Sequence, residues 1–437
     1  MRIIQVIPGS GDNFYCENCV RDHAIVRALL KAGEDVTVVP LYLPAIVDPL
    51  EAAADVPVFF GGINAWLQQN FALFRKTPRW LDRLFDARGL LKMAARRAGS
   101  VRARGLGEMT YSVLQGADGR QRKELARLLE WLDTQPRPDL VHLSSPLLLG
   151  IGQAVRARYG VPIVCTLQDE DVWIDAMEEP WRTRCWDAMA AGAADVAAFV
   201  AVSRWFGGIM RDRLRIPADR LHVVPVGIDP GPEPGEPPQG PPAIGYLARM
   251  SASQGLGLLA EAYLRLRKGG RFPGLRLRVS GGSTADDEPF LEDLRGRFAA
   301  EGASSDVELG LPFDPPSRRR LMASLSVLSV PAPNGVAFGT YILEALAAGV
   351  PVVQPRVGSF PEIVEATGGG VLVEPNDPDS LARALGDLLA DGARRAEMGR
   401  RGRRAVVEAF SLQAMATNTI EVYRRARAGV QPAGSPS

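Results

Sequence analysis

The fold is decided by one stretch of sequence, NGVAFGTYILEALAAGVPVV, which runs from Asn334 to Val353. The pattern predicts a glycine-containing loop, a helix from about Thr340 and a strand that opens at Val350. Backbone N–H groups at the start of this helix would favour a phosphate. Glu344 lies one turn further on, on the same face as Thr340, where its carboxylate can accept hydrogen bonds from a ribose diol. The alternative is that Glu344 is an ordinary solvated helix residue.

Short β-branched runs alternate with longer helical patterns along the whole chain, which predicts parallel sheets built from βαβ units. In the first half the predicted strands are 3–7, 36–39, 140–143, 163–166, 198–202 and 222–224. In the second half they are 243–246, 275–280, 325–330, 350–353 and 371–373. We therefore predict an α/β protein with two Rossmann-like, doubly wound domains facing each other across a cleft. Ligands of such domains bind at the carboxyl ends of the strands.

A stretch rich in proline and glycine separates the two halves and predicts an interdomain linker. The predicted parts are a first domain over 1–229 with a basic helical insertion at about 66–130, a linker over 230–242, a second domain over 243–411, an amphipathic helix over 412–428 that packs back on the first domain, and a flexible tail over 429–437.

Composition narrows the class of protein. With 437 residues, the chain is too long for one hydrophobic core. Its net charge of +1 argues against a nucleic-acid-binding protein. Three histidines and four cysteines leave little material for a metal site or a disulfide framework. The apolar start of the chain stops at Pro8 and predicts a strand, not a signal peptide. The most apolar window, 188–202, is interrupted by Asp195, so we expect a cytoplasmic protein.

One segment departs from the near-neutral average. Between Arg75 and Arg104, ten basic and two acidic residues give a net charge of +8. Aromatic residues such as Trp66 and Trp80 precede this segment and interleave with it. One interpretation is a pair of solvated insertion helices. The other is a patch for an anionic acceptor or a membrane surface, which would place the protein at the inner face of the membrane through residues 66–104.

Several motifs together resemble family 4 of the retaining glycosyltransferases, which have the GT-B fold. The stretch 334–353 is similar to the family's donor-binding signature, and Gly358-Ser359-Phe360-Pro361-Glu362-Ile363-Val364 is similar to its Gly-x-x-Pro-Glu-x-Ile/Val loop. The run 370–378 matches the strand and turn that follow. Gly245-Tyr246-Leu247-Ala248-Arg249 resembles the strand whose arginine meets the donor diphosphate.

The resemblance implies metal-independent transfer of a sugar from a nucleotide-diphosphate sugar, with the anomeric configuration retained, to an acceptor that the sequence does not identify. No cofactor is implied, because the nucleotide-sugar is a substrate. The residues expected to act in catalysis are Arg249, Gln168 and Asp169. Those expected to bind the donor are Gly11, Arg249, Gln254, Phe338, Gly339, Thr340 and Glu344. Those expected on the acceptor side of the first domain are Gly61, Gly62, Ser144 and Glu170.

The sequence departs from the family pattern at four positions. Val336 stands where the family has the first of two glutamates, and Gln254 stands where it has a lysine. Ser144 and Gln168 occupy positions where relatives often keep histidine. Two functions therefore stay open: an active glycosyltransferase with substituted polar contacts, and a nucleotide-sugar-binding or scaffold protein that has lost transfer. A nucleotide-sugar epimerase ranks third, because no separate motif supports that chemistry.

A Cys-x-x-Cys motif, Cys16 to Cys19, follows the glycine-rich loop that contains Gly9 and Gly11. Three roles stay open for it. The motif can start the helix predicted from Val20, it can carry thiol chemistry because a helix N-terminus lowers a thiol pKa, or it can bind a metal.

Overall fold

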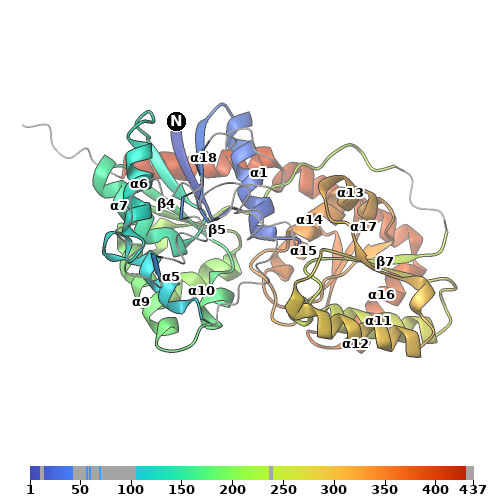
Figure 1. The fold of residues 1–437 in the computed structure, drawn as a ribbon. Helices are drawn as coiled ribbons and strands as arrows, with labels where there is room; N and C mark the ends of the chain where they lie inside the picture. The colour runs from blue at the N-terminus through green and yellow to red at the C-terminus, as the bar shows by residue number, and fades with distance from the viewer. Residues whose placement is uncertain are drawn as a thin grey trace, which may run out of the picture. The chain divides into compact units, whose positions relative to one another are not determined.

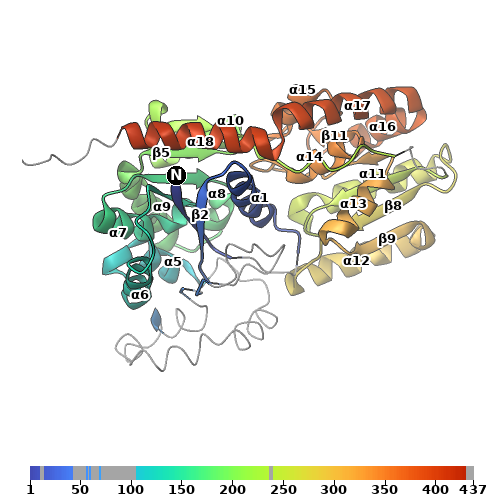
Figure 2. The same ribbon diagram turned by 90° about the horizontal axis from the view of Figure 1, so that it is seen from above.

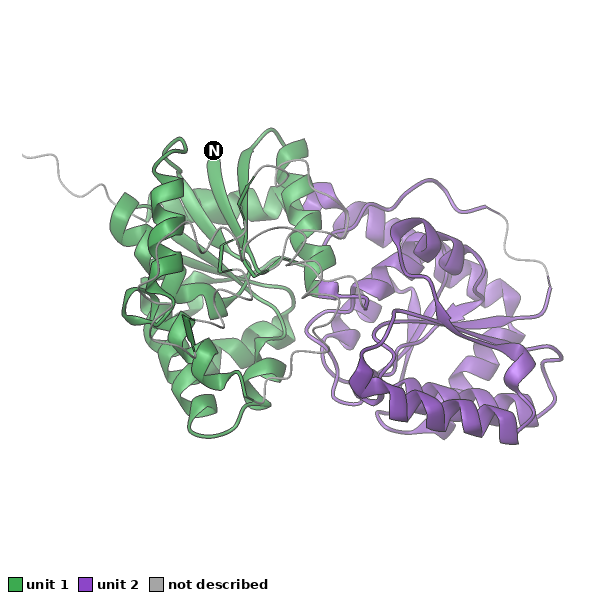
Figure 3. Ribbon diagram, in the orientation of Figure 1, with its two compact units in different colours: residues 1–11, 18–225, 415–437 green, residues 12–17, 226–414 purple. Residues whose placement is uncertain are grey.

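The structure is a computed structural model that describes residues 1–9, 14–42, 56–57, 59–60, 68–69, 105–235 and 240–429. Its contacts divide the chain into two compact units, which Figure 3 shows in different colours. Unit 1 comprises residues 1–11, 18–225 and 415–437, and unit 2 comprises residues 12–17 and 226–414. The predicted basic patch at 75–104 lies outside the described residues.

Unit 1 is built on a parallel sheet of six strands in the order β2-β1-β3-β4-β5-β6. The strands are β1 (Arg2–Ile7), β2 (Asp35–Pro40), β3 (Leu140–Leu143), β4 (Ile163–Leu167), β5 (Ala198–Ala201) and β6 (Leu221–Val223). Every residue of β3, β4 and β5 is buried, which explains why these strands appear as continuous apolar runs. All six strands predicted for the first half are confirmed, with ends that shift by at most one residue.

Helices cover both faces of this sheet (Figures 1 and 2). They are α1 (Glu17–Lys31), α5 (Gly107–Leu114), α6 (Arg122–Leu132), α7 (Leu149–Tyr159), α8 (Glu170–Asp175), α9 (Trp181–Gly192), α10 (Arg204–Leu214) and α18 (Leu412–Ala428). Helix α18 comes from the far end of the chain. Its buried Tyr423 bonds through its hydroxyl to Nδ1 of His142 on β3 at 2.6 Å, so the end of the chain completes the core of unit 1.

Unit 2 has a second parallel sheet, in the order β12-β11-β10-β7-β8-β9. The strands are β7 (Ala243–Leu247), β8 (Arg276–Ser280), β9 (Val307–Leu311), β10 (Val327–Leu328), β11 (Val352–Pro355) and β12 (Gly370–Val373). Strand β9 was not predicted. Strand β11 begins two residues later than predicted, because the N–H of Val350 still donates to the carbonyl of Ala345 and closes the preceding helix.

The helices of unit 2 are α11 (Leu256–Lys268), α12 (Glu288–Ala300), α13 (Pro315–Ala323), α14 (Thr340–Ala347), α15 (Phe360–Thr367), α16 (Pro378–Ala390) and α17 (Gly392–Ala409). Helix α14 begins at Thr340 as predicted. Buried Arg403 of α17 donates to the carbonyls of Pro230 and Gly231 and pairs with Glu233 at 3.0 Å. The start of the predicted linker is therefore held against unit 2. Among the described residues, none of the helices is both long and apolar enough to cross a membrane.

Candidate active site

The donor-binding residues predicted in unit 2 lie in loops and at a helix start that follow the carboxyl ends of its strands. Arg249 comes two residues after β7, and the loop after β10 leads into α14. Gly339 caps this helix with φ +96°, a conformation that favours glycine. Gly335, in the same loop, is equally constrained, because an added Cβ would lie 2.5 Å from the backbone of Gly358. The loop is therefore closely packed, and it holds the first turn of α14 in place.

The start of α14 already carries a negative charge. The N–H of Thr340 donates to Oε2 of Glu17, a residue that belongs to unit 2 although it begins α1. A carboxylate is stabilised by the unpaired N–H groups and the dipole of a helix N-terminus. The position where the sequence predicts a phosphate is thus an anion site, and the protein's own carboxylate occupies it.

Glu344 is held by two hydrogen bonds. Its Oε1 accepts from the hydroxyl of Tyr15 at 3.0 Å, and its Oε2 accepts from Nε of Arg318 at 3.0 Å. The carboxylate side chain is only 15% exposed, so the interpretation as a solvated helix residue is wrong. Burial, followed by the negative charge of Glu344, raises the pKa of Tyr15 well above its usual value. Tyr15 therefore stays a hydrogen-bond donor at every physiological pH.

Arg249 is paired with a carboxylate. Its Nε and Nη2 donate to the two oxygens of Asp287 at 2.8 and 3.1 Å, and Nη2 also donates to the hydroxyl of Thr284. The guanidinium lies 5.5 Å from the centre of the Phe14 ring. The Arg249 side chain is 31% exposed to solvent. Arg249 is therefore oriented by Asp287.

Two positions at which the sequence departs from the family pattern lie near these residues in the chain: Gln254 follows Arg249, and Val336 precedes Thr340. Gln254 ends a short 3-10 turn, and its Oε1 is buried without a hydrogen-bond partner among the described residues. The following Gly255 has φ +78°, and an added Cβ there would lie 2.0 Å from the carbonyl oxygen of Pro331. Val336 is half-buried, and its carbonyl accepts from Ser359. Phe338 is buried and its ring lies 6.5 Å from that of Phe410.

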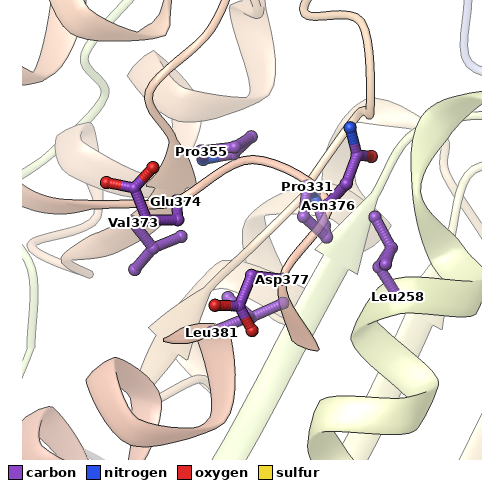
Figure 4. A pocket seen from close by; sticks show the side chains of 8 residues that line it. All are labelled: Leu258, Pro331, Pro355, Val373, Glu374, Asn376, Asp377 and Leu381. Atoms are coloured by element: carbon purple, nitrogen blue, oxygen red, sulfur yellow. The ribbon is translucent and has the colours of Figure 1, made fainter. Parts of the chain in front are cut away.

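A small pocket lies at the carboxyl ends of β10, β11 and β12 (Figure 4). It encloses about 190 Å³ of empty space, part of it open to solvent. The pocket is lined by Leu258, Pro331, Pro355, Val373, Glu374, Asn376, Asp377 and Leu381. None of the predicted donor residues lines it, so it is separate from the group formed by Arg249, Thr340 and Glu344.

In unit 1, the predicted residues gather where β3 and β4 end. The Gln168 amide is fully engaged, because Nε2 donates to the carbonyl of Ser144 at 2.9 Å and Oε1 accepts from Arg21 at 2.6 Å. The Gln168 N–H donates to both oxygens of the buried Glu170 carboxyl group. Of these four predicted residues, Asp169 alone is not buried, and its backbone has φ +58°. Asp169 is therefore the most accessible of the four residues.

Arg21 lies in the same cluster and was not predicted from the sequence. Its guanidinium is buried, donates to Thr166 and Gln168, and lies 3.3 Å from Asp22. Thr166 in turn bonds to Nε2 of His142 at 2.8 Å. Burial, followed by the charge of Arg21, lowers the pKa of His142 to about 3. The sequence offers one signal for this buried cluster, because Arg21 and Asp22 stand next to each other inside an apolar helical pattern.

The buried Glu170 carboxyl predicts an unusual pH dependence of stability. Burial raises its pKa from 4.5 to about 8. Between these values the folded protein binds a proton that the unfolded chain does not, so the free energy of unfolding falls as pH rises, by up to about 1.4 kcal/mol per pH unit. Urea unfolding at pH 5 to 8 should give a slope that is more negative in the wild type than in Glu170→Gln by up to this amount, and the difference isolates Glu170 from Asp22 and His142, whose shifted pKa values also contribute. Equal slopes would contradict the assignment.

Three further predicted residues, Gly11, Gly61 and Gly62, lie outside the described residues. Cys16 and Cys19 are disulfide-bonded, whereas Cys165 and Cys185 are buried free thiols. While Cys16 and Cys19 form a disulfide, neither sulfur is available as a thiolate ligand for a metal. In the described part of the chain, no three His, Cys, Asp or Glu residues are placed to hold a metal ion.

Two family models match the chain in succession. Residues 108–231 match Glycosyltransferase Family 4, and residues 231–405 match Glycosyl transferases group 1. The chain belongs to family 4 of the glycosyltransferases, whose members are retaining enzymes that use nucleotide-sugar donors. Among its relatives is the MMP alpha-(1->4)-mannosyltransferase of Mycolicibacterium hassiacum, which is 30% identical over 67% of this chain and 72% of the relative. A glycogen synthase of Mycobacterium tuberculosis is 27% identical over 68% of this chain and 71% of the relative.

Solved structures show the same fold. Sucrose-phosphate synthase from Thermosynechococcus elongatus superposes with a TM-score of 0.71 at 18% identity, over 98% of this chain and 100% of that one. HepE of Anabaena in complex with UDP superposes with a TM-score of 0.67 at 15% identity, over 97% and 100%. The predicted GT-B fold and the resemblance to family 4 are confirmed.

Proposed function

We propose that this protein transfers a hexosyl unit from a nucleotide-diphosphate hexose to a hydroxyl acceptor, without a metal ion. The observation that carries the proposal is the placement of Arg249 in the loop after β7, and of Thr340 and Glu344 in the first turns of α14, beyond the carboxyl ends of the unit 2 strands. These residues supply a cation, a helix N-terminus and a carboxylate, which match a diphosphate and a ribose. The named relatives include a mannosyltransferase and a glycogen synthase, which supports a hexose.

The roles follow from the chemistry of each group. Transfer with retention requires stabilisation of the diphosphate that leaves and of the positive charge that develops at the sugar carbon. Arg249 would bind phosphate oxygens with the edge of its guanidinium that Asp287 does not engage. Glu344 would accept hydrogen bonds from the ribose hydroxyls in place of the one from Tyr15. Asp169 would bind a hydroxyl of the sugar or of the acceptor.

A second function is favoured by a specific observation. Gln254 and Val336 remove a positive charge and a carboxylate from the donor site, and the remaining charged groups are paired with one another. A protein of this kind could bind nucleotide-sugars without transferring the sugar. In that case nucleoside diphosphates bind, and no donor is consumed.

The two functions are separated by a direct measurement. Calorimetry with UDP, GDP and ADP identifies the base of the donor nucleotide. It is done with the Cys16–Cys19 disulfide oxidised and with it reduced. The matching nucleotide-sugars are then incubated with the protein, with and without EDTA. Chromatography of the nucleoside diphosphate that is released measures transfer or hydrolysis. We expect turnover that EDTA does not reduce. Nucleotide binding without turnover of any donor would favour the binding protein, and absence of nucleotide binding would contradict both.

Asp169→Asn is expected to lower kcat by on the order of 100-fold, because a positioned carboxylate contributes about that much when it orients or deprotonates a hydroxyl. The Kd of the nucleoside diphosphate should not change, since Asp169 belongs to unit 1. The control is Asp175→Asn, an exposed carboxylate at the other end of α8. A kcat that Asp169→Asn leaves unaltered would remove Asp169 from the site.

A further inference from the structure

One short segment, Phe14 to Glu17, contacts Arg249, Thr340 and Glu344, the three residues of unit 2 that carry the proposed function. These residues belong to unit 2 by their contacts, although they lie in the chain next to β1 and α1 (Figure 3). Tyr15 donates its N–H to the carbonyl of Gly281 at 2.7 Å, and Phe14 forms a β-bridge with Gly282. The backbone of the segment is thereby fixed beside the loop that follows β8.

The side chains of this segment correspond to parts of a nucleotide. The Phe14 ring lies against Arg249, the proposed diphosphate ligand. The Tyr15 hydroxyl bonds to Glu344, as a ribose hydroxyl would, and its ring lies 5.4 Å from the guanidinium of Arg318. The Glu17 carboxylate accepts from Thr340 N, where an anionic oxygen would bind. A nucleotide cannot occupy these positions while the segment does.

A covalent link bounds the same segment. Cys16 lies between Tyr15 and Glu17 and is disulfide-bonded, as is Cys19 in the first turn of α1. Both cysteines are half-buried, so neither is enclosed in the core. The short Cys-x-x-Cys ring restricts the backbone on both sides of Glu17, and a restricted backbone loses less entropy when its side chains bind. The oxidised motif therefore favours occupation of the donor site by the segment.

We propose that Cys16 and Cys19 form a redox-active modification site, and that its reduction by a dithiol releases residues 14–17 from the donor site. This proposal rests on the proposed function. In the reaction, a thiolate of the dithiol attacks one sulfur of the disulfide and forms a mixed disulfide. The second thiol of the reductant then displaces that sulfur. The dithiol leaves as a disulfide, and Cys16 and Cys19 gain two electrons and two protons. A helix N-terminus stabilises the thiolate that is released.

The first test compares nucleotide binding in the two redox states. Oxidised protein and protein reduced with dithiothreitol, with thiols counted by alkylation and mass spectrometry, are titrated with UDP and GDP by calorimetry. We expect reduction to tighten binding by at least tenfold. The double variant Cys16→Ser/Cys19→Ser should bind like the reduced form and should not respond to dithiothreitol. Equal affinity of the oxidised and reduced wild type would overturn the proposal.

Two variants separate the effect of the side chains of residues 14–17 on nucleotide binding from the effect of the disulfide. Tyr15→Phe/Glu17→Gln keeps the disulfide and removes the hydroxyl and the carboxylate, so its oxidised form should bind like reduced wild type. Glu397→Gln, an exposed carboxylate on α17, is the matched control and should retain the redox response. An oxidised Tyr15→Phe/Glu17→Gln variant that binds as weakly as oxidised wild type would also overturn the proposal.

A readout without nucleotide distinguishes this proposal from the proposed function. Hydrogen exchange of peptides that span residues 14–17 and the start of α14 should become faster on reduction, because Thr340 N–H loses its partner Glu17. If no nucleotide binds in either state, the proposed function fails, whereas the exchange result still decides whether the disulfide holds the segment. Exchange that reduction does not change would overturn the redox proposal.

Discussion

Arg249→Ala is expected to lower kcat/KM for the nucleotide-sugar by about 100- to 1,000-fold. In the proposed metal-independent transfer, preorganised donors stabilise the charge that develops on the leaving group, and loss of one donor costs about this much. The effect is enlarged because Asp287, which pairs with Arg249 through both oxygens, would be left beside the diphosphate with an uncompensated charge. Initial-rate kinetics on the reduced protein measures it.

Two neighbouring variants serve as controls for this result. Arg249→Lys keeps the charge and loses the planar fork, so it should recover part of the rate. Asp287→Asn keeps a hydrogen-bond acceptor for Arg249 and removes the competing negative charge, and it should bind the nucleoside diphosphate at least as tightly as wild type. A rate that Arg249→Ala leaves within twofold of wild type would mean that the diphosphate binds elsewhere.

Glu344→Gln should weaken the binding of a nucleoside diphosphate by roughly 10- to 150-fold. Hydrogen bonds to a charged group contribute about 1.5–3 kcal/mol, which corresponds to that range of affinity. The comparison that isolates the ribose uses the matching 2′-deoxynucleoside diphosphate. Wild type should prefer the ribonucleotide, whereas Glu344→Gln should show little preference between the two.

This comparison also separates recognition from folding. Arg318 loses its ion-pair partner in Glu344→Gln, so some loss of stability is expected and can be measured by thermal unfolding. A misfolded variant would bind neither nucleotide, and a correctly folded one binds both with similar affinity. A variant that still prefers the ribonucleotide as strongly as wild type would contradict the assignment of Glu344 to the ribose.

The sheets could be predicted because their central strands are buried on both faces and therefore leave uninterrupted apolar runs in the sequence. Strand β9 was not predicted because it lacks such an apolar run. It lies at the edge of its sheet, none of its residues is buried, and Gly310 interrupts it with φ +81°. Edge strands carry a weaker hydrophobic signal than central strands do.

Motifs in the sequence place Arg249 and Glu344 at the proposed donor site, and their role in binding the donor stays a prediction. The partners of these residues could not be predicted. Tyr15 lies 329 residues before Glu344 in the chain, and Asp287 lies 38 residues after Arg249. No local pattern connects such pairs, because the fold brings them together. Buried Arg21 was missed for a related reason, since burial of a charge depends on partners that only the folded chain provides.

The position of α18 has a consequence for the order of folding. Tyr423 is buried in the core of unit 1 and bonded to His142, although it lies within the last fifteen residues of the chain. During synthesis, β1 to β6 leave the ribosome long before this helix does. Unit 1 must therefore wait, with the face of its sheet that receives α18 uncovered, until unit 2 has been made. Unit 2 has no such requirement beyond residue 414, so it can complete its fold first.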